Sequence, residues 1–95
     1  MADTDREARE RFAANIERLR RREGLSVETL ADLSRIDGSE LREILRADRE
    51  ADYTTIARLA EALGVEPGEL FEGIAWIPPG EDGGGRFEVD EPDGV

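Results

Sequence analysis

Two short amphipathic segments lie back to back in residues 25–45, which read LSVETLADLSRIDGSELREIL. In residues 25–33 and again in 37–45, apolar residues recur at the three- and four-residue intervals that place them on one face of a helix. Only residues 34–36 separate the two segments. A gap of this length suits the tight turn of a helix pair whose second helix enters the major groove of DNA.

Capping and stop residues extend this pattern to five predicted helices. Ser26 and Asp37 stand at the N-cap positions of the two short helices, and Glu40 follows Asp37 at the spacing of a capping box. Asp52 can cap a further helix, which Gly64 would end as the residue after its last turn. The predicted helices are residues 6–22, 26–33, 38–46, 53–63 and, starting at Pro67, 67–73.

The composition changes after the last predicted helix. Residues 74–77 are apolar and residues 86–89 alternate polar with apolar, which predicts two short strands. Residues 78–85 between them are rich in proline and glycine and predict a loop. Residues 90–95 form an acidic tail that we expect to be disordered. The two strands can pair as a hairpin.

Three short motifs stand in this chain at Gly24-Leu25-Ser26, Leu30-Ala31 and Ala62-Leu63-Gly64-Val65. In these motifs, and over about residues 12–72 without a gap, the chain resembles the phage repressor/Cro (XRE-type) helix-turn-helix family. The resemblance implies a compact five-helix domain that binds operator DNA. We therefore expect an all-α, five-helix repressor-like DNA-binding domain over residues 1–73, and a C-terminal strand or hairpin with the acidic tail over residues 74–95.

The resemblance implies six candidate DNA contacts on and beside the helix at about 38–46. Leu41 and Ile44 define the buried face of that helix, so the positions opposite them point outward. Arginine is the commonest reader of guanine, and a carboxylate can accept a hydrogen bond from cytosine N4. The outward positions are Ser39, Arg42, Glu43 and Arg46, and the expected phosphate contacts are Arg35 and Arg49. The same side chains also suit a solvated helix face.

Several positions depart from the family pattern. Where the family usually has a glutamine that holds phosphate, a glycine in the turn, a glutamate, a second glycine and a proline, this chain has Val27, Arg35, Leu45, Ala47 and Ala51, in that order. The missing glutamate usually pairs with the arginine that falls on Arg20, which must therefore find another partner or stay solvated. Residues 35–49 hold four arginines and four acids, so the local charge is zero.

The net charge of −11 belongs mainly to the C-terminal half of the chain. Residues 6–49 hold eleven arginines against ten acids, whereas residues 50–95 hold two arginines against twelve acids. Phosphate neutralisation dominates DNA affinity, but local rather than total charge decides an interface. The acidic half keeps an alternative open: a helix-turn-helix fold used as a protein-interaction module, antitoxin-like or partner-binding, with weak or no DNA binding.

The 95-residue chain contains no cysteine and no histidine. It therefore has no thiolate chemistry and lacks the commonest metal ligand and general base. We expect no enzymatic activity, no cofactor and no metal site. No apolar run is long enough to cross a bilayer, and the polar N-terminus shows no signal peptide. These features predict a cytoplasmic protein with no membrane partner.

The predicted function is a sequence-specific DNA-binding transcriptional regulator with its recognition helix at about 38–46. Its partner is double-stranded DNA, and a homodimer is expected because one such unit contacts few base pairs. The predicted dimer surface consists of four apolar residues outside the helical core, Ile74, Trp76, Phe87 and Val89. The alternative for these residues is that the hairpin folds back on the helix at 67–73 of the same chain.

Overall fold

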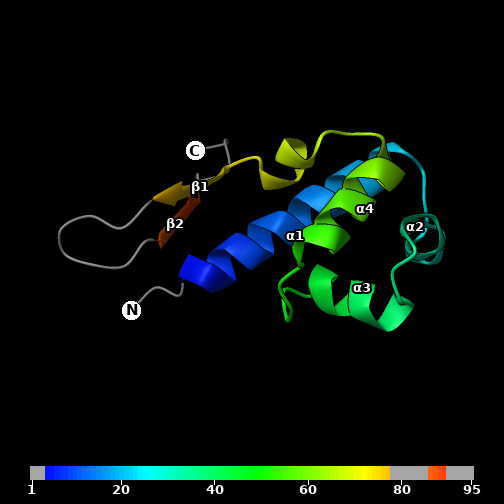
Figure 1. The fold of residues 1–95 in the computed structure, drawn as a ribbon, viewed down its shortest axis with the longest axis horizontal. Coiled ribbons are helices and arrows are strands. Elements are labelled where there is room, and N and C mark those ends of the chain that lie inside the picture. Colours follow the sequence, from blue (N-terminus) through cyan, green and yellow to red (C-terminus); the bar gives the residue numbers. More distant parts are fainter. Residues whose placement is uncertain (1–3, 78–85, 90–95) are drawn as a thin grey trace.

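The computed structural model describes residues 4–77 and 86–89, in which packed helices carry a hairpin at one end (Figure 1). Its elements are α1 (Thr4–Arg22), α2 (Val27–Ser34), α3 (Gly38–Leu45), α4 (Tyr53–Leu63), the 3-10 helix η1 (Pro67–Phe71), β1 (Ile74–Ile77) and β2 (Arg86–Val89). The four α-helices of the described residues lie where the sequence predicts them. The predicted loop at 78–85 and tail at 90–95 lie outside the described residues.

The core is built from one apolar stripe of each α-helix. The almost completely buried apolar side chains are Ile16 and Leu19 of α1, Leu30 of α2, Leu41 and Ile44 of α3, Leu59 of α4 and Leu70 of η1. They belong to one continuous cluster. In it α2 packs against α3 and α4, while α3 also packs against α1. The buried stripe of α3 therefore fixes which face of that helix is turned outward.

The N-caps predicted at Ser26, Asp37 and Asp52 are formed, whereas the capping box predicted between Asp37 and Glu40 is not. The hydroxyl of Ser26 accepts a hydrogen bond from the backbone N–H of Thr29 at 3.0 Å, and the carboxylate of Asp37 caps α3 in the same way. Asp52 accepts from the backbone N–H of Thr55 at 2.8 Å. That backbone hydrogen bond, aided by the Thr55 hydroxyl, holds the pKa of Asp52 below its usual value, because both donors favour the carboxylate.

The fifth predicted helix is wrong in type, because residues 67–71 form the 3-10 helix η1. Gly68, the second residue of this segment, disfavours an α-helix, whereas Pro67 at the first position is compatible with either type of helix. Its end is fixed from elsewhere: the side-chain amide of Asn15, buried on α1, donates to the carbonyls of Leu70 and Glu72, each at 2.9 Å. The five residues of η1 bury Leu70 completely, so the segment closes the core without becoming an α-helix.

The two predicted strands pair as an antiparallel hairpin. Ile74 lies opposite Val89 and Trp76 lies opposite Phe87 in the register. Both strands lie against α1, β2 more extensively than β1 (Figure 1). The hairpin therefore folds back within the chain, with α1 as its main neighbour rather than the segment at 67–73. Ile74 packs against the edge of the helical core.

In the part of the chain that the structure describes, left-handed backbone occurs at two non-glycine residues, one near each end of α3. Arg35, in the turn before α3, has φ +58°, and Ala47, after α3, has φ +64°. These are two of the positions where the resembled family usually has glycine. The Arg35 backbone N–H bonds to the carbonyls of Ala31 and Asp32, which closes α2. The turn thus keeps the glycine conformation while carrying a side chain, at a cost of about 1–2 kcal/mol.

We expect Arg35→Gly to raise the free energy of unfolding by up to about 1 kcal/mol, because relief of the left-handed strain exceeds the entropy that glycine adds to the unfolded chain. Arg35→Ala is the matched control, since it removes the same exposed side chain but keeps the strain. Urea denaturation of both variants measures the difference. Equal stability of the two variants would contradict the strain assigned to this turn.

Candidate nucleic-acid interface

The helix α3 and the turns that flank it lie along one side of the fold (Figure 1). Leu41 and Ile44 are buried, whereas Ser39, Arg42 and Arg46 are exposed. The remaining predicted contacts are the half-buried Glu43 on α3, the exposed Arg35 in the turn before α3 and the exposed Arg49 after it. The structure therefore brings all six predicted residues to α3 or its immediate flanks, four of them on the helix itself or its C-cap.

Three of the four arginines that were predicted to contact DNA form an ion pair with a carboxylate. The guanidinium of Arg42 lies 3.4 Å from Glu28 of α2, and that of Arg49 lies 3.4 Å from Glu43. Arg46 lies 3.2 Å from Asp48 in the loop after α3. These are exposed ion pairs, so each contributes little to stability. The positive charge of this surface is nonetheless largely compensated within the protein.

Glu28 and Asp48 were not predicted as residues of this surface. Asp48 follows Arg46 by two residues, a spacing at which the sequence shows no reason for a pair. Glu28 precedes Arg42 by 14 residues, and the two meet only because α2 and α3 pack side by side. Pairing across two helices depends on their crossing geometry, which no spacing in the sequence reveals.

Arg20 pairs with a different acid from the glutamate that the family has at the position of Leu45. Its guanidinium forms an ion pair with Glu17, one turn earlier on α1, and donates to the carbonyl of Leu25 at 2.6 Å. The Arg20 side chain is only 17% exposed, so this pair is sheltered from solvent. Arg20 therefore joins the end of α1 to the start of the α2 segment and is not part of the exposed surface. The three-residue spacing to Glu17 is the signal that predicts this pair.

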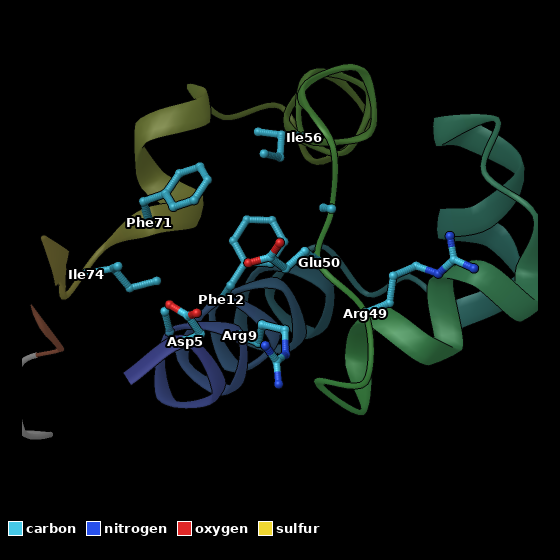
Figure 2. Close-up of a pocket in the computed structure, with 10 residues that line it drawn as sticks. Asp5, Arg9, Phe12, Arg49, Glu50, Ile56, Phe71 and Ile74 are labelled. Carbon is cyan, nitrogen blue, oxygen red and sulfur yellow. The ribbon is translucent and has the colours of Figure 1, made fainter. Parts of the chain in front are cut away.

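A pocket of about 250 Å³ lies between α1, the segment 49–51 after α3, and residues of α4, η1 and β1 (Figure 2). Its apolar lining includes Phe12, Ile56, Phe71 and Ile74, and the rings of Phe12 and Phe71 lie 5.1 Å apart. Figure 2 shows the side chain of Arg49 directed away from these residues. Sequence reasoning did not predict this pocket. Its lining is that of an incompletely filled core edge rather than a constellation of reactive groups.

Within residues 4–77 and 86–89, no group of acidic side chains is arranged to hold a metal ion. Among the same residues, none of the helices has the length and apolar character needed to cross a membrane.

In a comparison with known protein families, residues 11–72 match a family described as a helix-turn-helix domain. This match covers more than half of the chain. No match is found among curated proteins. Among solved structures, the chain is similar to the restriction-modification controller protein C.AhdI from Aeromonas hydrophila. The two share 41% identity with a TM-score of 0.65, over 66% of this chain and 96% of that one.

Two further solved structures are similar in fold and sequence. One is an HTH_3 family transcriptional regulator from Vibrio cholerae, 25% identical with a TM-score of 0.68 over 73% of this chain and 39% of the regulator. The other is the clp gene regulator ClgR from Corynebacterium glutamicum, 27% identical with a TM-score of 0.63 over 66% of this chain and 67% of that one.

Proposed function

The chain belongs to the XRE-type helix-turn-helix domain family, and from this membership we propose that it is a sequence-specific DNA-binding transcriptional regulator. In this proposal α3 enters the major groove and the chain occupies an operator near a promoter. The observation that carries it is the outward row of polar side chains on α3, opposite the buried Leu41 and Ile44. The similar proteins, a controller protein and two regulators, support the same class of function.

The proposed roles follow from side-chain chemistry. Arg42 pairs with the O6 and N7 atoms of a guanine, and Glu43 accepts from the N4 amino group of a cytosine. Ser39 and Arg46, on the same outward face, supply further contacts to base edges. Arg35 and Arg49 flank α3 on its two sides and contact phosphates, which fixes the register of the helix in the groove.

A second candidate function is a protein-interaction module. The observation in its favour is the ion pairing of Arg42, Arg46 and Arg49, which compensates most of the positive charge on the proposed surface. The acidic residues 50–95 would then repel DNA and attract a basic protein partner. This candidate needs no base-reading side chain.

Selection from a random duplex library separates the two functions. The purified chain is expected to enrich a defined sequence, with an affinity that falls steeply as the salt concentration rises. The measurement is fluorescence anisotropy on the selected duplex and on a scrambled duplex of equal length. If both duplexes bind alike, or neither binds at low salt, the protein-interaction module becomes the function.

We further propose that the hairpin at 74–89 mediates a homodimer that doubles the DNA footprint. Ile74 and Val89 are partly buried within the chain, while the side chains of Trp76 and Phe87 lie outside the described residues. Deletion of residues 74–95 is expected to convert a dimer into a monomer in analytical ultracentrifugation and to leave most helical circular dichroism, since residues 1–73 are proposed to fold as a domain. Deletion of residues 90–95 alone is the control. A full-length chain that is monomeric at high micromolar concentration would rule out this interface.

A further inference from the structure

We propose that Glu28 and Asp48 are affinity-lowering residues of the DNA surface, which act by holding the arginines that DNA must recruit. The inference rests on the proposed function and concerns its regulation. In the free protein each carboxylate forms an ion pair with the guanidinium group of its arginine. In the complex with DNA, a base edge or a phosphate replaces the carboxylate as the partner of that arginine. The two carboxylates therefore raise the protein concentration at which a DNA site becomes filled.

The geometry supports competition rather than permanent pairing. The Arg42–Glu28 pair is 3.4 Å long with side chains 52% and 72% exposed, and the Arg46–Asp48 pair is 3.2 Å long with 62% and 61% exposed. Both lie in solvent, where a pair is weak and readily exchanged. The sheltered Arg20–Glu17 pair is different, because its arginine also donates to the carbonyl of Leu25. Arg42 and Arg46 can thus change partner without disturbing the fold.

Each carboxylate is an intramolecular anion that competes with DNA for one guanidinium. Its loss is expected to tighten binding to every duplex, because the arginine no longer has to leave a partner. The effect is about two- to fivefold per carboxylate, which is the size that exposed ion pairs reach. The preference for one base over another is expected to stay, because the arginine that reads the base is unchanged.

The test compares Glu28→Gln with wild type by fluorescence anisotropy on the selected and scrambled duplexes. We expect the dissociation constant to fall about two- to fivefold on both. Glu61→Gln is the matched control, since Glu61 is an exposed acid toward the end of α4 that lies away from α3 (Figure 1). Asp48→Asn repeats the test through Arg46 and does not depend on α2 being unperturbed.

A double-mutant cycle identifies the route of the effect. When Arg42 has already been replaced by alanine, Glu28→Gln is expected to lower the dissociation constant no more than Glu61→Gln does, because Glu28 no longer has an arginine to hold. A gain that persists at full size would mean direct repulsion of phosphate and would overturn the proposal. A loss of affinity in Glu28→Gln would overturn it too, since the carboxylate would then position Arg42 for binding.

The remaining outcomes separate this inference from the proposed function. If wild type selects a sequence but Glu28→Gln and Asp48→Asn bind it no more tightly than Glu61→Gln, the competition is refuted and the regulator remains. If no variant binds any duplex at low salt, both proposals fail.

Discussion

Replacing Leu30 with alanine is expected to lower the free energy of unfolding by about 2–5 kcal/mol, the range for removing a large side chain from a packed core. Leu30 is fully buried in the cluster that joins the helices. Ile44→Ala is expected to have an effect in the same range, because Ile44 is 1% exposed on the inner face of α3. Since small domains have a total stability of about 5–15 kcal/mol, either change removes a large part of it.

The chain offers a matched control on the same helix. Leu33 lies three residues after Leu30 on α2 but is 56% exposed. Leu33→Ala is therefore expected to change the stability by no more than about 0.5 kcal/mol, as exposed substitutions do. Urea denaturation followed by circular dichroism measures all three variants. Equal midpoints for Leu30→Ala and Leu33→Ala would show that the inner face of α2 is assigned incorrectly.

The helical part of the fold was predictable because its signals are local. The caps at Ser26, Asp37 and Asp52 and the apolar stripes lie within one or two turns of the residues they organise. The error at 67–71 arose because that segment depends on a distant residue. The side-chain amide of Asn15 donates a hydrogen bond to the carbonyl of Leu70, which lies 55 residues later in the sequence. Because that carbonyl already has a partner, the segment does not have to continue as an α-helix.

In the candidate site, too, the features set by local sequence were predictable and those set by tertiary packing were not. The outward positions of α3 follow from the helical period once Leu41 and Ile44 are placed inside. The partner of Arg42 does not follow, because Glu28 reaches it only through the packing of α2 on α3. The same packing makes the electrostatic state of the surface a tertiary property. The left-handed conformation of Arg35 was predictable only in part. The family resemblance indicated a position that usually holds glycine, but only the structure shows that Arg35 adopts the left-handed conformation there.

Replacing Arg42 with alanine is expected to relax the base preference at one position of the selected duplex and to weaken binding by about 1–3 kcal/mol, the discrimination of one bidentate contact to guanine. Arg42 lies on the outward face of α3 and is held by an exposed ion pair, so its removal leaves the core intact. Arg42→Lys is expected to lose much of the same preference, since lysine keeps the charge but not the planar fork. The measurement is anisotropy on duplexes that differ at single base pairs.

Two further arginine variants separate base reading from charge. Arg49→Ala is expected to weaken binding to all sequences alike and to flatten the salt dependence by about one unit, because a phosphate contact carries no sequence information. Arg18→Ala is the matched control, since Arg18 is an exposed α1 residue paired with Glu72 at 3.1 Å rather than with any acid beside α3. It removes the same charge and the same kind of ion pair, so an equal loss of base preference in Arg18→Ala and Arg42→Ala would show that α3 does not read the bases. A loss confined to Arg42→Ala, with Arg49→Ala uniform across sequences, is the pattern that a recognition helix produces.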